Sequence, residues 1–198
     1  QNALRSNYAN NYDVNRSERY CDEQEQYSRR ECLEIHGIPT MVKEDTNDLV
    51  VKVGSLINVK IDPNDISVSH RLPTKNKGRK DNTVPIIVRF IKRDVRDQLY
   101  SSRRLLKDHT IDDIGLGRLG SYKIFIQESL TSKKKELFKK CLKFKKENRF
   151  KFIWTSYGTI YLRKNEHSPS HKIAFESNLT RLSGFSLHPA SYAQVVQG

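Results

Sequence analysis

The stretch PIIVRFIKRDVRDQLY (Pro85–Tyr100) decides the fold, because its periodicity changes from that of a strand to that of a helix within sixteen residues. Its first part, Pro85–Ile91, is rich in β-branched and aromatic residues and is typical of a buried strand. Over Arg93–Asp108 the apolar residues recur at helical spacing, which predicts an amphipathic helix. A strand that leads directly into such a helix indicates a fold that mixes α and β elements.

Other segments around this stretch complete the order β-α-β-β-α-β. Alternating apolar and polar residues predict a half-buried strand over Cys32–Ile38, and acidic cap residues followed by an apolar stripe predict a helix over Glu44–Ile57. Asp65–Leu72 and Lys123–Gln127 also have strand character. The order is the ferredoxin-like split arrangement of RNA-recognition-motif (RRM) domains, so the sequence predicts an α+β fold with an RRM-like domain over residues 31–128.

A second, smaller α+β unit is predicted over residues 129–182. Its helix begins near Thr131 and carries an apolar stripe together with many lysines. Two strands follow within Lys151–Lys164, around a Tyr157–Gly158 turn. The segment His171–Phe175 either adds a third strand or ends the unit.

The two ends of the chain have weaker patterns. Residues 1–13 are rich in Asn and are expected to be a disordered lead-in, and residues 183–198 are expected to be an unstructured tail. Residues 14–30 lack Gly and Pro, alternate in charge and contain a weak seven-residue repeat. They form either the remnant of a coiled coil or a solvated surface helix. The repeat consists of Val14, Cys21 and Ser28.

The charge of the chain is unevenly distributed. Its 36 Lys and Arg residues exceed its 23 Asp and Glu residues, which gives a formal net charge of +13. Residues 1–70 carry 8 basic and 12 acidic side chains, whereas residues 71–172 carry 27 basic and 10 acidic side chains. A basic surface of this size predicts a polyanionic partner. Nucleic acid is favoured over an acidic membrane surface, because no amphipathic anchoring helix accompanies the charge.

Several other functional classes find no support in the sequence. No apolar run reaches the roughly 20 residues of a membrane-spanning helix, and no secretory leader is expected after Gln1. The three cysteines are far apart and form no CxxC pair, which argues against a disulfide scaffold or a zinc site and for a reducing compartment. Phosphate-binding glycine motifs and the GxSxG motif are absent, so we expect neither an enzyme nor a cofactor.

Two predicted helices carry the candidate contacts to nucleic acid. On the first, one aromatic and three cationic residues form either a binding stripe or an ordinary solvated face. On the second, lysines crowd the first turn, where the helix dipole disfavours cations, and a bound phosphate would relieve that repulsion. Trp154, in the predicted hairpin, either stacks on a base or is buried in the core. The stripe residues are Arg96, Tyr100, Arg103 and Lys107, and the lysines are Lys133, Lys134 and Lys135, continued by Lys139 and Lys140.

An ordered set of segments across Arg16–Leu182 closely resembles the first-open-reading-frame proteins of LINE-type non-LTR retrotransposons, also called the transposase 22 family. The chain looks most like the invertebrate proteins, which are similar in their C-terminal part to the baculovirus few-polyhedra (FP) protein. The resemblance implies a trimer-forming coiled coil, an RRM domain and a small C-terminal domain, which together bind single-stranded nucleic acid as a chaperone. The segments are EQYSRRECLEIHGIP, DISVSHRLP, PIIVRFIKRDVRDQLY, IFIQESLTSKKKELFKKCLKFKKE and FIWTSYGTIYLRKNE.

The resemblance also implies which residues bind RNA. In that family, RNA-binding basic residues lie at the junction of coil and domain and at the end of the second strand. Others lie late in the second helix and at the start of the C-terminal helix, and one aromatic residue lies in the hairpin. Residues 1–13 depart from the family pattern because they do not continue the heptads, so a trimer is expected only where the full coiled coil is present. The matching residues are Arg29, Arg30, Arg71, Arg103, Arg104, Lys133–Lys135 and Trp154.

The function expected from these features is non-enzymatic binding of single-stranded RNA, with DNA as a second ligand. We expect chaperone-like activity in a retrotransposon ribonucleoprotein of the cytoplasm and the nucleus, without a membrane partner. The rival expectation is an FP-like structural or protein-interaction role of viral or host origin. A transposase or nuclease would need clustered carboxylates to hold Mg²⁺, and the sequence offers no such cluster.

Overall fold

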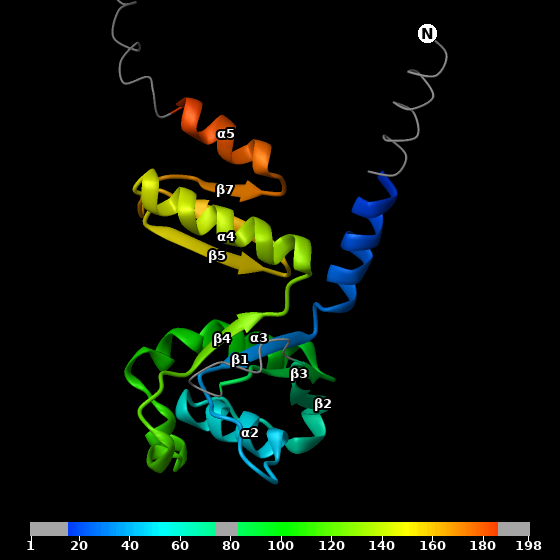
Figure 1. The fold of residues 1–198 in the computed structure, drawn as a ribbon, viewed down its shortest axis with the longest axis vertical. Helices are drawn as coiled ribbons and strands as arrows, with labels where there is room; N and C mark the ends of the chain where they lie inside the picture. The colour runs from blue at the N-terminus through cyan, green and yellow to red at the C-terminus, as the bar shows by residue number, and fades with distance from the viewer. Residues whose placement is uncertain (1–15, 74–82, 186–198) are drawn as a thin grey trace, which may run out of the picture. The chain divides into compact units, whose positions relative to one another are not determined.

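The protein, described by a computed structural model over residues 16–73 and 83–185, contains two compact units (Figure 1). Among the described residues, one unit lies within residues 27–129, and the other comprises residues 16–26 together with 130–185. The predicted lead-in, Val14 of the seven-residue repeat and residues 186–198 of the predicted tail lie outside the described residues.

The unit of residues 27–129 has the predicted split order of strands and helices. All neighbouring strands are antiparallel, and the strand order in the sheet is β2-β3-β1-β4. The first strand of this unit, β1, is therefore central in the sheet, and its last strand, β4, lies at an edge. This order confirms the α+β fold and the ferredoxin-like arrangement. The elements are β1 (Cys32–His36), α2 (Thr46–Leu56), β2 (Ile66–Arg71), β3 (Ile86–Phe90), α3 (Arg93–Ser102) and β4 (Phe125–Glu128).

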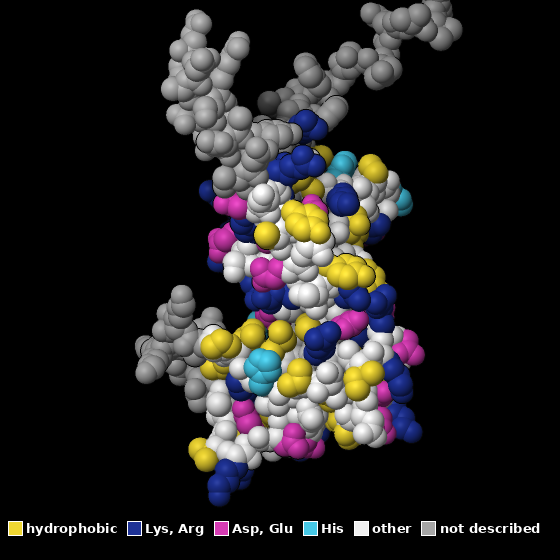
Figure 2. All heavy atoms as spheres, turned by 90° about the vertical axis from the view of Figure 1, so that its right-hand side faces the viewer, with side chains coloured by type: hydrophobic (Ala, Val, Ile, Leu, Met, Phe, Trp, Pro, Cys, Tyr) yellow, Lys and Arg dark blue, Asp and Glu magenta, His cyan; other side chains and the backbone are white. Residues whose placement is uncertain are grey.

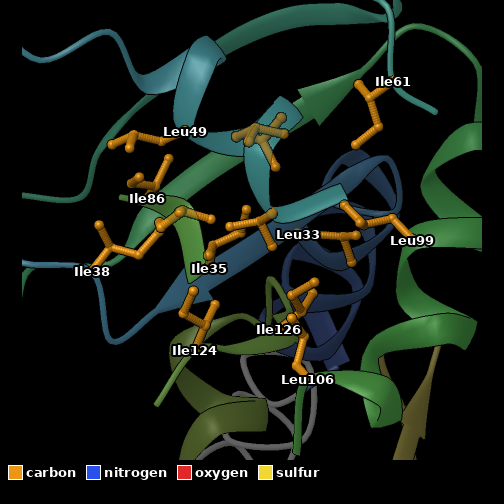
Figure 3. Close-up of a cluster of buried hydrophobic side chains, with 14 of the residues drawn as sticks. Leu33, Ile35, Ile38, Leu49, Ile61, Ile86, Leu99, Leu106, Ile124 and Ile126 are labelled. Atoms are coloured by element: carbon orange, nitrogen blue, oxygen red, sulfur yellow. The ribbon is translucent and has the colours of Figure 1, made fainter. Parts of the chain in front are cut away.

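One face of this sheet forms the core with the two helices. Leu33 and Ile35 of β1 are fully buried, and their partners in β3 are the buried residues Val88 and Ile86. Figure 3 shows Leu33, Ile35 and Ile86 gathered with Leu49 of α2, Leu99 of α3 and others from the connecting segments. The predicted helix start is confirmed, because the Asp45 carboxylate accepts hydrogen bonds from the backbone N–H groups of Asn47 and Asp48.

The second helix of this unit is shorter than predicted. The α-helix ends at Ser102, and Arg103–Asp108 continues as a 3₁₀-helix. At this junction the Arg103 guanidinium donates to the carbonyl oxygen of Tyr100, one of the carbonyls that a helix end leaves without an intrahelical partner. This change of helix type interrupts the predicted stripe. Arg96 and Tyr100 lie on the α-helix, whereas Arg103 and Lys107 lie on the 3₁₀-helix, so the four residues do not follow one α-helical repeat.

The other unit packs two helices beside a three-stranded antiparallel sheet. Its strand order is β5-β6-β7, so the segment His171–Phe175 does contribute a third strand. The final helix was not predicted; it begins in a turn where the Asn178 side chain accepts hydrogen bonds from the backbone N–H groups of Ala174 and Phe175. The elements are α4 (Ser132–Glu147), β5 (Phe152–Ser156), β6 (Thr159–Arg163), β7 (Ser170–Ile173) and α5 (Glu176–Phe185).

The core of this unit lies between α4, α5 and one face of the sheet. Cys141 and Phe144 of α4 meet Ile160 and Leu162 of β6, with Leu179 of α5 beside them. Burial raises the pKa of the Cys141 thiol to about 11, so this cysteine acts as a small apolar core residue. Within residues 16–73 and 83–185, no helix is long and apolar enough to cross a bilayer.

Truncation of the buried Leu162 tests this core. Leu162→Ala should lower the unfolding free energy of the unit by about 2–5 kcal/mol, because it removes apolar contacts and leaves a cavity. Urea unfolding followed by the fluorescence of Trp154, the single tryptophan of the chain, reports on this unit. Leu142→Ala is the matched control, since Leu142 is 44% exposed and should change stability by only about 0.5 kcal/mol. Equal losses in the two variants would contradict the assigned core.

Candidate nucleic-acid interface

The first turn of α4 contains the lysine cluster that the sequence singled out. Thr131 is the N-cap, and its hydroxyl accepts a hydrogen bond from the backbone N–H of Lys134 at 3.3 Å. The helix therefore begins at the predicted residue. Its first turn contains no acidic residue, so the repulsion between the lysines and the helix dipole is not relieved from within the helix.

The relief comes from elsewhere in the same unit. Lys133 Nζ lies 2.8 Å from a carboxylate oxygen of Glu18, which belongs to the N-terminal helix (residues 16–28). Hydrogen bonding to Glu18 raises the pKa of Lys133, and the same bond lowers the pKa of Glu18. Lys134 Nζ donates to the carbonyl oxygen of Gly158 at 2.8 Å. Two of the predicted phosphate-binding lysines, Lys133 and Lys134, are thus already in contact with oxygen atoms of the protein.

The lysines farther along α4 are exposed and form surface ion pairs. Lys139 lies 2.7 Å from Glu136, and Lys140 pairs with Glu176 of α5. Such pairs contribute little to stability, so a polyanion can exchange with the carboxylates at small cost. Residues 131–183 nevertheless carry 14 Lys and Arg residues against four Glu residues and no Asp, so most of the positive charge of this segment is not matched by its own acids.

The sheet of this unit turns a second set of side chains away from α4. Side chains alternate along a strand, so Ile153 and Thr155 of β5 face the helices, whereas Phe152 and Trp154 face the other side. Across β6, Phe152 pairs with Arg163 and Trp154 pairs with Tyr161. We call the set Phe152, Trp154, Tyr161 and Arg163 the aromatic face.

The side chains of the aromatic face are stacked on one another. The rings of Trp154 and Tyr161 are 5.4 Å apart and inclined by only 13°. The Arg163 guanidinium lies 4.8 Å from the ring centre of Phe152 and 6.0 Å from that of Trp154. These contacts are typical of cation–π pairs and offset stacking. None of the four residues belongs to the hydrophobic core, so core burial of Trp154 is wrong.

This arrangement suits a single-stranded nucleic acid. Stacked, half-buried rings present flat π surfaces on which an unpaired base can lie, and the neighbouring guanidinium can contact a phosphate. Tyr157 lies in the β5–β6 turn, as predicted, with a positive φ of 48°, and is 49% exposed. The turn itself touches the start of α4 through Lys134 and Gly158.

In the unit of residues 27–129, Arg71 has a structural position. Its guanidinium donates to both carboxylate oxygens of Glu44 at 2.7 Å and to the carbonyl oxygens of Ile38 and Pro39. Only 13% of its side chain is exposed. Burial alone would raise the pKa of Glu44, but the hydrogen bonds from Arg71 and from the Met41 backbone, together with the charge of Arg71, outweigh it, and the pKa lies below its usual value. Arg71 thus ties the end of β2 to the segment that follows β1.

Arg96 is also part of the interior, which corrects its place in the predicted stripe. Its guanidinium lies 2.6 Å from Glu128 of β4, and 3% and 2% of the two side chains are exposed. A carboxylate in this position compensates the burial of the guanidinium. Arg96 was expected to face solvent, because the sequence places it beside the apolar positions of α3 and gives no sign of the distant Glu128.

The remaining predicted residues of this unit lie nearer the surface. Arg103 stacks over the half-buried Tyr100 at 3.7 Å, and Arg30 stacks over Tyr27 at the same distance. Arg29 donates to the Ser129 hydroxyl at 3.1 Å. Arg104 and Lys107 are exposed on the 3₁₀-helix that follows α3. These residues form no single stripe, and we centre the candidate interface on the other unit.

Sequence reasoning missed one ring pair. His36 of β1 and Phe125 of β4 are register partners on the open face of the four-stranded sheet, and their rings stack 4.7 Å apart. The two rings meet only because β1 pairs with β4. The split topology predicts this pairing of strands, so the ring pair could have been found from the sequence once that topology was assumed. In the described parts of the chain, no group of three His, Cys, Asp or Glu side chains could hold a metal ion.

Comparison with known protein families finds a similarity within one of the two units. Residues 131–183 match the family model of baculovirus FP protein domain 2. The match runs from the N-cap of α4 into α5 and includes the whole aromatic face. It confirms the predicted similarity of the C-terminal part to the FP protein. No curated protein is significantly similar to the chain.

Replacement of Arg96 tests its structural role. Arg96→Ala should lower the stability of its unit by about 3–5 kcal/mol, because Glu128 would remain buried without its partner. Native-state hydrogen exchange of the β1 and β3 amides measures this loss. The control is Arg93→Ala, since Arg93 is 53% exposed, lies 3.8 Å from Glu31 and should contribute about 1 kcal/mol or less. An Arg96→Ala variant that exchanges like the control would contradict the structural assignment.

Proposed function

We propose that the protein is a non-enzymatic binder of single-stranded nucleic acid, with RNA as its main ligand. The aromatic face of the β5–β7 sheet is the observation that carries this proposal. Three aromatic rings and one guanidinium stand on the side of the sheet that α4 and α5 do not cover. The three rings are half-buried, and stacking with a base would use the ring surface that remains exposed.

Bases and phosphates would contact different parts of the unit. The bases stack on Trp154 and Tyr161, and the sugar–phosphate chain follows the cationic side chains around them. Arg163 lies on the face itself, Lys172 is the exposed partner of Tyr161 in β7, and Lys151 lies 5.4 Å from the ring of Phe152. Such contacts use the π surface and the phosphate that every nucleotide has, so binding is weakly sequence-specific and strongly salt-dependent.

The resemblance to LINE first-open-reading-frame proteins supports the same proposal. In a ribonucleoprotein of that kind, contacts that exchange quickly would let strands anneal and rearrange, which is chaperone-like activity. Where the full coiled coil is present, it would assemble a trimer, and several copies on one RNA would raise the effective affinity. The complex would lie in the cytoplasm and the nucleus.

A structural or protein-interaction role is the second candidate, and the match to baculovirus FP protein domain 2 favours it. In addition, Tyr20 and Tyr27 of the N-terminal helix are 64% and 63% exposed. They are seven residues apart, so they lie near the same side of the helix and could contact another protein. In this role the lysines of α4 would serve solubility, and removal of the aromatic face would not matter.

Truncation of the stacked pair separates the two roles. Trp154→Ala and Tyr161→Ala should each weaken binding of a labelled single-stranded RNA of about 30 nucleotides by roughly 5- to 150-fold, since stacking on one base contributes about 1–3 kcal/mol. Fluorescence anisotropy at several salt concentrations measures the affinity. Tyr157→Ala is the matched control, because it removes an exposed aromatic ring outside the aromatic face.

The proposal predicts a steep loss of wild-type affinity as salt rises and little change in the control. If all three variants bind RNA as the wild type does, the aromatic face is not the binding site. If the wild type fails to bind at low salt, the protein-interaction role remains. Circular dichroism of each variant shows whether the unit is still folded.

A further inference from the structure

The N-terminal helix places acidic side chains against the start of α4. Its residues 16–26 belong to the same unit as α4, and they carry four acidic and two basic side chains. Glu18 reaches Lys133 at 2.8 Å, and Asp22 also helps to raise the pKa of that lysine. The acidic helix therefore occupies the electrostatic position in which a phosphate was expected.

Gln26 fixes the acidic helix at this place. It is 5% exposed, and its side-chain oxygen accepts the backbone N–H of Thr131, the N-cap of α4, at 3.0 Å. The side chain also fits against Gly158 of the β5–β6 turn, where a Cβ atom would lie 2.4 Å from the Gln26 side-chain carbon. At the other end, the Arg19 guanidinium lies 5.0 Å from the ring of Phe175. The docking contacts are thus specific but polar.

Acidic residues line the space between the helix and α4. A hollow of about 590 Å³ separates them, and Glu18, Asp22 and Glu25 line it together with Lys133. On the face drawn in Figure 2, Lys and Arg side chains are intermixed with Asp and Glu side chains. A phosphate that approaches Lys133 from this hollow passes more acidic than basic residues.

We propose that residues 16–26 act as a built-in competitor of nucleic acid at the start of α4. The inference rests on the proposed function, because it concerns regulation of the same unit. A strand bound on the aromatic face that continues past the β5–β6 turn reaches Lys134 and then Lys133. To contact these lysines, its phosphates displace the Glu18 carboxylate.

The acidic helix weakens the binding of nucleic acid at Lys133 but does not prevent it. Glu18 and Lys133 are 57% and 56% exposed, so water and salt screen their attraction. A strand that contacts several cations at once has the advantage of multiple contacts, whereas the helix offers one ion pair at this point. Short ligands should be excluded from Lys133 more effectively than long ones.

Removal of the Glu18 charge tests the inference in the full chain. Glu18→Gln should bind a labelled 30-nucleotide RNA about two- to fivefold more tightly than the wild type, because Lys133 no longer has to exchange one anion for another. The control is Glu147→Gln. Glu147 is likewise 57% exposed and lies 3.9 Å from Lys143 of the same helix, so the change in net charge is identical. A smaller gain is expected for the control.

Equal gains in the two variants, or no gain in Glu18→Gln, would overturn the competitor while leaving the proposed function intact. If neither the wild type nor Glu18→Gln binds RNA, both fail. Hydrogen exchange gives a second readout. The competitor predicts that RNA increases amide exchange in residues 16–26, because the helix loses its contacts to α4. Decreased exchange there would overturn the inference, since RNA would then add to the docked helix.

Discussion

The packing of α4 against one side of the β5–β7 sheet determines which side chains the protein presents on the other side. Leu162 and Ile160 of β6 must face α4 to fill the core, and strand alternation then leaves no choice for their neighbours. Tyr161 and Arg163 point away from the helix, and so do the partner residues Phe152 and Trp154. A shift of one residue in register would bury a guanidinium and expose the core. The aromatic face therefore follows from the same constraint that stabilises the unit.

The distribution of charge has a different physical basis. A count of lysines overstates the positive surface available to a ligand, because several of these lysines contact oxygen atoms of the protein. Lys133 contacts Glu18, Lys134 contacts a backbone carbonyl, and Lys140 contacts Glu176. Exposed contacts of this kind are weak and exchangeable, unlike the buried pair of Arg96 and Glu128. Burial, and not position in the sequence, thus determines whether a cationic side chain is available to a ligand or serves the stability of the fold.

Local patterns in the sequence were sufficient for the elements that depend on near neighbours. The N-caps Asp45 and Thr131 and the split order of strands and helices were predicted, because caps and periodicity are local signals. The role of Arg96 was not, since Glu128 is distant along the chain. The end of the helix at Ser102 depends on a change of pitch that apolar spacing does not encode.

The candidate site was predictable only in part. The pattern indicated that Trp154 alternates with Ile153 but not which of the two faces α4, because both are apolar enough for a core. The stack of Trp154 on Tyr161 requires the register of the hairpin. The contact of Glu18 with Lys133 joins two helices that are far apart in the chain, and neither segment contains a sequence pattern that predicts it. The helix α5 was not predicted because its apolar face is short. Leu179 and Leu182 pack on the core, but the residues around them are mostly polar, as in an unstructured tail.

The proposed function depends most on the stacking of bases on the aromatic face. Photo-crosslinking of the full chain to a single-stranded RNA that contains 4-thiouridine, followed by mass spectrometry of the linked peptides, locates the bases directly. If bases stack on the aromatic face, the strongest crosslinks map to Trp154 and Tyr161 and fade as salt is raised. Crosslinks confined to peptides of residues 27–129, with none in β5 or β6, would contradict it.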